Sequence, residues 1–253
     1  MNSISKLVKI GKNVRIGINN ILGDNVILGD NVILGDNNNI FSNNVIYSNV
    51  EIGNNNVFLE GNIIGEHPVN MDDFTDKIHN GVKIGNNNYF HCNSIIFGGT
   101  QNNKTIIYDN NKVSCNTHIG HDVIINNNVY LYPNVYICGH SILLDNSGIG
   151  IAGGIHQERV LGKYSFIGMG CPASKNIFPY YIYAGNKYLR MNTKRVPEEY
   201  HKYDKELFYY LNNHIKMSEN ENKEYLSIFN NEIRIDLTDF FNSINIFKNK
   251  KIK

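Results

Sequence analysis

Aliphatic and aromatic side chains recur at every sixth position along most of the chain. The first unbroken series is Ile10, Ile16, Leu22, Leu28, Leu34, Ile40, Ile46, Ile52, Phe58 and Ile64. After a bridge, the second is Ile107, Val113, Ile119, Ile125, Leu131, Ile137, Leu143, Ile149, Ile155, Leu161 and Ile167. A period of six fits neither an α-helix nor a sheet of hairpins. It predicts a solenoid in which each hexapeptide forms one strand and one corner, with three hexapeptides per triangular coil.

The polar residues between these anchors suit the corners of such a coil. Gly, Asn and Asp tolerate the left-handed backbone conformation that a tight corner requires. Runs such as LGDNVILGDNVILGDNNN supply them, and 32 of the 44 asparagines precede residue 150. Stacked coils would pair at the ordinary strand spacing of about 4.8 Å. The pattern therefore predicts an all-β solenoid, a parallel β-helix.

The repeat is interrupted twice and then ends. Residues 66–81 and 98–105 break the period, so we expect them to form loops that project from the coil. The pattern stops after Ile177. We therefore predict a β-helix domain over residues 1–178 and a helical region over residues 179–253.

Helical signals follow in the C-terminal region. Pro197, with two glutamates after it, is typical of a helix start. Tyr200, Leu207, Tyr210 and Leu211 continue at helical spacing, and a further helix is expected near residues 220–230.

Composition excludes several classes of protein. The 24 basic and 23 acidic residues give a net charge of +1, whereas nucleic-acid binding needs a basic excess. No apolar run is long enough to span a membrane, and the first residues lack the pattern of a signal peptide. The four cysteines form no CxxC pair, which argues against a zinc site or a disulfide framework. We expect a cytoplasmic protein with no nucleic-acid partner and no transmembrane segment.

Four of the nine histidines fall on one edge of the predicted coil. Counted within 18-residue turns, His118, His121, His140 and His156 take nearly equal positions on three successive coils. Histidine is well suited to general-base catalysis near neutral pH. Asp122 follows His121 and could hold its imidazole in the required tautomer.

The same edge allows two kinds of chemistry. Gly139 precedes His140, and its N–H could face a developing oxyanion. Three histidines could instead bind zinc, although their spread over three coils favours a site without metal. The histidine edge thus predicts either an acyl-transfer site or a metal centre, with the first preferred.

These residues resemble a known enzyme family. CNTHIGHDV, ICGHSI, AGGIHQERVLG and FPYYIYAGN resemble the UDP-N-acetylglucosamine O-acyltransferase of lipid A biosynthesis. They are similar as well to the nucleotide-amino-sugar N-acyltransferases that share its left-handed β-helix. GEHPVN at residues 65–70 resembles the acceptor loop, and TDFF at 238–241 resembles part of the helical tail. The specific match covers roughly residues 60–195. The resemblance implies a left-handed β-helix and a homotrimer with active sites between subunits.

The resemblance also implies a role for each matched residue. Catalysis would fall to His121 as the general base, Asp122 as its partner and Gly139 as the oxyanion donor. The acyl donor would contact His140, Gln157, Phe166 and Met169. The acceptor sugar would contact Asn70, His118, His156, Asn186, Lys194 and Arg195.

Some positions depart from the family pattern. Asp72 replaces a lysine that contacts substrate, and MNTKRV replaces the GL-x-RR element that grips the nucleotide phosphates. Phe166 and Met169 occupy a stretch in which small residues make room for a long acyl chain. We therefore expect an acyl donor shorter than 3-hydroxymyristoyl.

The main interpretation is an N-acyltransferase that moves a short acyl group from a thioester to the amino group of a nucleotide-linked sugar, for surface polysaccharide assembly. Its co-substrate would be acyl-CoA or an acyl carrier protein, with no permanently bound cofactor or metal. The first alternative is the O-acyltransferase of lipid A biosynthesis, which uses an acyl carrier protein. A γ-carbonic-anhydrase-like metalloenzyme and a non-catalytic structural β-helix remain open.

Overall fold

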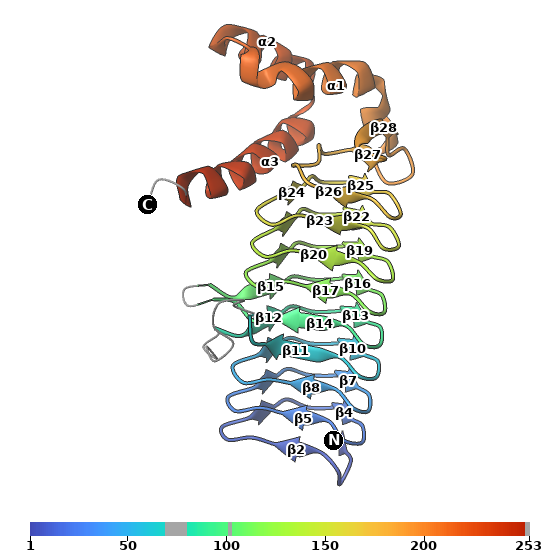
Figure 1. Cartoon of the computed structure of the whole chain (residues 1–253), viewed down its shortest axis with the longest axis vertical. Coiled ribbons are helices and arrows are strands. Elements are labelled where there is room, and N and C mark those ends of the chain that lie inside the picture. The colour runs from blue at the N-terminus through green and yellow to red at the C-terminus, as the bar shows by residue number, and fades with distance from the viewer. Residues whose placement is uncertain (69–79, 101–102, 251–253) are drawn as a thin grey trace.

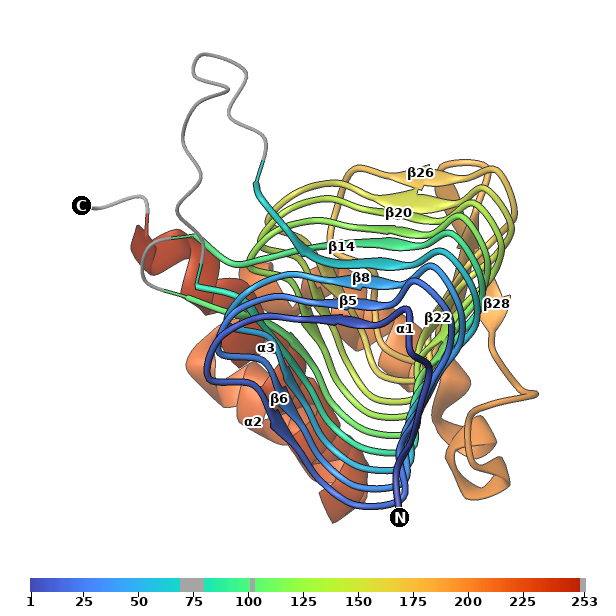
Figure 2. The ribbon, with the colours of Figure 1, turned by 90° about the horizontal axis from the view of Figure 1, so that it is seen from below.

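The computed structural model describes residues 1–68, 80–100 and 103–250. The coils stack from the N-terminus upward, and helices lie at the C-terminal end (Figure 1). Seen along the stack, each coil is a triangle whose sides belong to three parallel sheets (Figure 2).

Strands three apart in the sequence pair with each other in these sheets. Sheet A contains β1 (Ser3–Ile4), β4 (Ile21–Leu22), β7 (Asn39–Ile40), β10 (Val57–Phe58), β13 (Tyr89–Phe90), β16 (Lys112–Val113), β19 (Tyr130–Leu131), β22 (Gly148–Ile149), β25 (Phe166–Ile167), β27 (Tyr181–Ala184) and β28 (Lys187–Met191). Sheet B contains β2 (Lys9–Ile10), β5 (Ile27–Leu28), β8 (Val45–Ile46), β11 (Ile63–Glu66), β14 (Ile95–Phe97), β17 (His118–Ile119), β20 (Tyr136–Ile137), β23 (Gly154–Ile155) and β26 (Pro172–Ala173). Sheet C contains β3 (Arg15–Ile16), β6 (Ile33–Leu34), β9 (Glu51–Ile52), β12 (Val82–Ile84), β15 (Thr105–Ile107), β18 (Ile124–Ile125), β21 (Ile142–Leu143) and β24 (Val160–Leu161).

The sixth-position anchors form the core. From Leu22 onward they are at most 2% exposed, and they stack in columns inside the triangle. Phe58 and Phe90 stack with ring centroids 4.6 Å apart. Burying one such side chain contributes about 1.5–3 kcal/mol, so the column supplies the main driving force for folding. The predicted left-handed parallel β-helix with a C-terminal helical region is confirmed.

Each corner turns on one residue with a positive φ angle. These residues recur every sixth position from 13 to 61 and from 110 to 170, with two more at 87 and 93. Most are asparagine, with φ between 56° and 62°. Asn is one of the few residues that visits this region readily, because its short amide can hydrogen-bond locally. The exceptions above residue 110 are Asp122, His140, Ala152, Glu158, Tyr164 and Gly170.

A second set of asparagines is buried beside sheet A. It consists of Asn20, Asn38, Asn56, Asn88 and Asn111. The side-chain oxygen of each of the first four accepts the backbone N–H of the asparagine one coil further along, at 2.8–2.9 Å. These amides satisfy corner N–H groups that would otherwise be buried without a partner.

The first helix begins at the predicted start after Pro197, whereas residues 181–191 of the predicted helical region form strands β27 and β28. Pro197 immediately precedes η1 (Glu198–Tyr203), which continues into α1 (Asp204–Asn213) and η2 (His214–Lys216). The helix expected near residues 220–230 is α2 (Glu219–Ile228), and Ser218 caps it with a capping box. The antiparallel hairpin of β27 and β28 was not predicted. The long helix α3 (Asn231–Lys250) contains TDFF at 238–241, which resembles part of the family's helical tail. The division into domains at residue 178 stays a prediction.

Helix α3 folds back onto the outer face of sheet C. Phe240 and Phe247 pack with Ile142, Leu144 and Val160. The buried carboxylate of Asp236 accepts hydrogen bonds from Lys163 Nζ at 2.6 Å and from Tyr180 Oη at 2.7 Å. Within the described ranges, no helix has both the length and the apolar character that crossing a membrane requires.

Replacing Asn38 tests the buried amide ladder. Asn38→Ala removes an acceptor for the N–H of Asn56 and a donor to the carbonyl of Gly53. Leaving buried partners unsatisfied should lower the free energy of unfolding by about 3 kcal/mol, measured by chemical denaturation. Asn39→Ala, one residue along in β7, is the matched control and should change it by less than about 0.5 kcal/mol. Equal effects of the two substitutions would contradict a special role for the ladder.

Candidate active site

The histidine edge lies where sheet B turns into sheet C. β17 and β20 each end at this corner, one coil apart. Asp122 and His140 are the positive-φ residues of these two corners, with φ of 57° and 60°. In the lower coils Asn13 and Asn31 fill the equivalent positions and are joined by an amide hydrogen bond. At the candidate site, a carboxylate and an imidazole replace this structural ladder.

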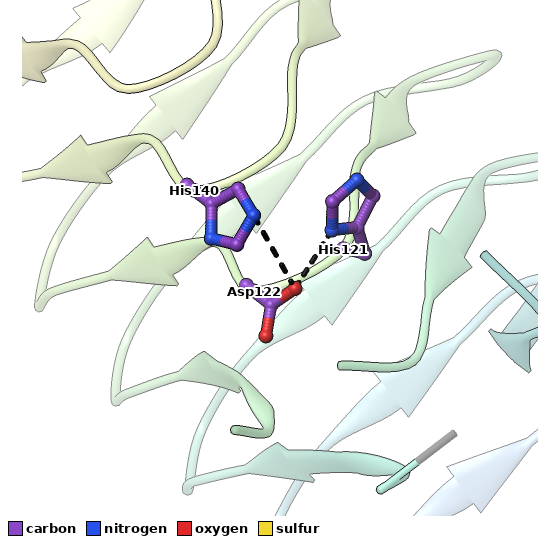
Figure 3. A group of neighbouring side chains, drawn as sticks. All are labelled: His121, Asp122 and His140. Carbon is purple, nitrogen blue, oxygen red and sulfur yellow. Dashed lines mark hydrogen bonds and ion pairs between the residues drawn. The ribbon is translucent and has the colours of Figure 1, made fainter. Parts of the chain in front are cut away.

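Asp122 lies between two imidazoles, as Figure 3 shows. His121 Nδ1 is 2.7 Å from Asp122 Oδ2, and His140 Nε2 is 3.8 Å from the same oxygen. The two rings are perpendicular, with centroids 4.9 Å apart. The Asp122 side chain is 2% exposed, whereas about a third of the His121 side chain is exposed. The prediction that Asp122 holds His121 agrees with this geometry.

The surroundings of Asp122 keep it ionised. Burial by itself would raise the pKa of its carboxyl group. Hydrogen bonds from His121 and from the side chain and backbone N–H of Thr100, together with nearby His140, outweigh burial and lower the pKa. The Thr100 N–H lies 3.1 Å from Oδ1 and 3.3 Å from Oδ2. An ionised Asp122 keeps a proton on His121 Nδ1 and leaves Nε2 as the basic nitrogen.

Gly139 faces the basic nitrogen of His121. A Cβ atom at residue 139 would lie 2.7 Å from His121 Nε2, so glycine is required for the ring to occupy this position. At the same place in lower corners, the N–H groups of Lys12 and Asp30 donate to side chains of the next coil. Among the described residues no acceptor takes up the Gly139 N–H. It remains able to donate to an oxyanion beside the base.

The same three residues have the spacing of a possible metal site. The ligand atoms of His121, Asp122 and His140 lie within 4.8 Å of one another. Two atoms that shared a zinc ion at about 2.0–2.2 Å each would lie roughly 3 Å or more apart. The 2.7 Å contact between His121 and Asp122 therefore fits a shared proton better than a shared ion.

His118 lies on the outer face of sheet B, close to the cluster in sequence. Its ring packs against Phe97 at 4.9 Å and Tyr136 at 6.0 Å between centroids. Burial lowers the pKa of His118. A neutral imidazole at this position suits hydrogen bonding to an uncharged sugar hydroxyl.

A groove of about 360 Å³ begins one residue from Gly139. Cys138 and His156 are among its lining residues, and its walls are mostly apolar. Small residues line much of it: Ala152, Gly153, Gly154, Gly170 and Ala173. The backbone N–H of Gln157 bonds to the thiol of Cys138 along this edge. The structure therefore brings His156 and Gln157 close to the predicted catalytic residues.

Phe166 and Arg195 form a separate cluster on sheet A. The Phe166 ring lies over Gly148 and meets Tyr132 edge-on. The Arg195 guanidinium lies 4.5 Å from the Tyr130 ring centroid and donates to the carbonyls of Asn146 and Ser147. The Phe166 ring occupies the space that Gly148 leaves open, and its contact with the acyl donor stays a prediction.

The remaining predicted residues lie further along the chain. Met169 is 74% exposed and directly precedes Gly170, one of the residues that line the groove. Asn186 lies in the tight turn between β27 and β28, and Lys194 is exposed after β28. Asn70 lies outside the described residues, as does the substituted position Asp72.

One participant was missed by sequence reasoning. Thr100 bonds to Asp122 through its backbone N–H and also through its side chain, and the six-residue pattern indicates neither contact. It lies in a segment that departs from the repeat, where the six-residue arithmetic no longer places residues. The positive-φ positions would have helped: asparagine gives way there to Asp122 and His140.

Known proteins of similar sequence and structure share one activity in their names. Acyl-[acyl-carrier-protein]–UDP-N-acetylglucosamine O-acyltransferase of Burkholderia orbicola is 37% identical over 83 residues, which cover 33% of this chain and 32% of that protein. The UDP-N-acetylglucosamine O-acyltransferase structure from Moraxella catarrhalis is 25% identical, with 96% of both chains covered and a TM-score of 0.81. The resemblance to the left-handed β-helix acyltransferases is confirmed.

The UDP-N-acetylglucosamine acyltransferase structure from Francisella novicida is 27% identical, with a TM-score of 0.72 over 89% of this chain and 83% of that one. No protein-family model matches the chain. The chain spans about a third of the length of the curated relatives that it matches. Among β-helix acyltransferases, the comparisons favour the O-acyltransferase alternative over the N-acyltransferase interpretation.

Removing the imidazole of His121 tests its assignment as the base. His121→Ala should lower turnover by about 10² to 10⁴, because a positioned base contributes that much. The apolar columns do not include this partly exposed corner residue, so the melting temperature should barely change. Steady-state kinetics and thermal denaturation measure the two effects. Near-full activity in this variant would place the base elsewhere.

Proposed function

We propose that this protein is an O-acyltransferase that moves an acyl group from an acyl carrier protein to a hydroxyl group of UDP-N-acetylglucosamine. The observation that carries the proposal is the placing of His121 Nε2 against Gly139, with Nδ1 held by Asp122. The names of the similar proteins supply the substrate class. The family resemblance supports a homotrimer as the active form.

The hydrogen-bonded pair of His121 and Asp122 favours a hydroxyl acceptor over an amine acceptor. A neutral amine attacks a thioester unaided, whereas a hydroxyl group needs a base to take its proton. Asp122 is buried, ionised and hydrogen-bonded to His121 Nδ1, an arrangement that leaves Nε2 free to accept the proton of a hydroxyl group. An enzyme for amine acceptors has less need of this pair.

The residues support a two-step transfer. His121 Nε2 takes the proton of the sugar hydroxyl while its oxygen attacks the thioester carbonyl, and the carbonyl π electrons move to oxygen. The Gly139 N–H donates to the resulting oxyanion. The tetrahedral intermediate then collapses: the C–S bond breaks, the C=O bond forms again, and His121 returns the proton to the leaving thiolate. Asp122 stabilises the imidazolium between the two steps.

The apolar groove suits the acyl chain. It starts at Cys138, next to the oxyanion donor, and small residues leave room along it. We propose that Met169, which is exposed and directly precedes the lining residue Gly170, limits the length of the chain. On this proposal the donor is shorter than 3-hydroxymyristoyl, and Phe166, whose ring lies over Gly148, does not set the limit.

Product chemistry tests the proposed reaction. The protein is incubated with acyl carrier protein thioesters and either UDP-N-acetylglucosamine or an analogue in which an amine replaces the accepting hydroxyl. We expect a hydroxylamine-sensitive ester on UDP-N-acetylglucosamine, detected by mass spectrometry and absent with His121→Ala. An amide on the analogue, with no ester formed, would instead support the N-acyltransferase interpretation.

Donor length tests the role of Met169. Each methylene that the groove cannot accept forfeits about 0.8 kcal/mol, and forcing it in adds strain of about 1–3 kcal/mol. In direct competition the protein should prefer a short acyl donor over the 3-hydroxymyristoyl donor by at least about a hundredfold.

If Met169 limits the chain, Met169→Gly should reduce this preference at least about tenfold, since it removes the side chain next to Gly170. Phe166→Ala is the matched control and should leave the preference unchanged, because that ring packs against Arg195. A wild-type preference for the long chain would refute the length limit.

A further inference from the structure

The described flanks of the two segments that interrupt the repeat are joined by hydrogen bonds beside the candidate site. The N–H of Gly98 donates to the Glu66 carbonyl at 2.8 Å, and that of Gly99 donates to the Gly81 carbonyl at 3.0 Å. The N–H of Asn80 donates back to the Gly99 carbonyl at 2.9 Å. The described flanks of the two interruptions therefore form a short extra ladder outside the repeat.

The side chain of Asn80 continues this ladder to Thr100. Its Nδ2 donates to the Thr100 carbonyl at 2.9 Å, and the N–H of Asn103 donates to the same carbonyl at 3.1 Å. The N–H of Thr100 in turn reaches both oxygens of Asp122. Residue Thr100 is thus held at its carbonyl while its N–H is aimed at the carboxylate.

The orientation of Asp122 depends on this N–H. His121 and His140 both lie near Oδ2, at 2.7 Å and 3.8 Å, so two imidazoles could compete for one oxygen. The Thr100 N–H contacts both oxygens and fixes the plane of the carboxylate. With the plane fixed, Oδ2 stays directed at His121 Nδ1.

We propose that Asn80 is a positioning residue, which acts through Thr100 and Asp122 to hold His121 in the tautomer protonated at Nδ1. Its catalytic consequence rests on the proposed function, since it concerns the base of the acyl transfer. Its structural part does not, because the tautomer exists in the free protein. A misplacement of about 1 Å far from the chemistry can lower a rate about a hundredfold.

Two substitutions separate the hydrogen bond from packing. Asn80→Ala removes the side chain, and Asn80→Asp keeps its shape but replaces the donor with a carboxylate. Lys104→Met is the matched control: it breaks the 2.5 Å ion pair with Glu51 at the end of the same segment, and such exposed pairs contribute little. Thermal denaturation verifies that each variant is folded.

The first readout is the His121 tautomer in substrate-free protein, from NMR of ¹⁵N-histidine-labelled protein, with the signal assigned by its loss in His121→Ala. Wild type and Lys104→Met should show Nδ1 protonated and Nε2 unprotonated. Both Asn80 variants should show this tautomer losing population. An unchanged His121 tautomer in both Asn80 variants would overturn the proposal, whatever reaction the protein catalyses. A change in Asn80→Ala alone would assign the effect to packing and would also overturn the proposal.

The second readout is kinetic. Both Asn80 variants should lower kcat about tenfold to a hundredfold while KM for the nucleotide sugar changes less than about twofold. A rise in KM with kcat unchanged would make Asn80 a binding residue and overturn the positioning role. If the wild-type protein transfers no acyl group, the proposed function fails, and the tautomer measurement still decides the role of Asn80.

Discussion

The fold depends on a corner in which one residue in six adopts a positive φ angle. The left-handed conformation costs roughly 1–2 kcal/mol for an ordinary residue and less for asparagine or glycine. Because the corners recur at fixed spacing, each strand is short and each anchor points into the triangle. The same spacing stacks equivalent side chains one coil apart. A side chain placed at a corner therefore always has a neighbour of known position above and below it.

The candidate site uses this stacking. In the lower coils, corner amides such as Asn13 and Asn31 bond to each other along the stack. At the site, Asp122 and His140 take the same strained position and bring their charged or polar groups to one point. The fold thus brings the Asp122 and His140 side chains close together. His121, one residue before Asp122, gains the buried Asp122 carboxylate as its hydrogen-bond partner. Replacing the corner asparagines by Asp122 and His140 therefore changes a stack of structural hydrogen bonds into a group of catalytic side chains.

Elements outside the repeat complete the candidate site and hold the C-terminal helices against the coil. The N–H of Thr100 fixes the carboxylate of Asp122 from an interruption of the repeat. At the C-terminal end, the buried carboxylate of Asp236 joins α3 to Lys163 and Tyr180. Arg195 stacks on Tyr130 and donates to backbone carbonyls on sheet A. These contacts link residues far apart in sequence, so no local pattern encodes them.

The sequence by itself determined the β-helix, the corner positions and the corner shared by His121, His140 and His156. Because the period is fixed at six residues, the residue number alone gives the position of each side chain on the coil. The tertiary structure decided what has no period: the Thr100 N–H on Asp122, the hairpin of β27 and β28, and the place of Phe166 over Gly148. Such contacts depend on how loops and ends pack against the coil, and packing is set by shape and hydrogen bonding in three dimensions.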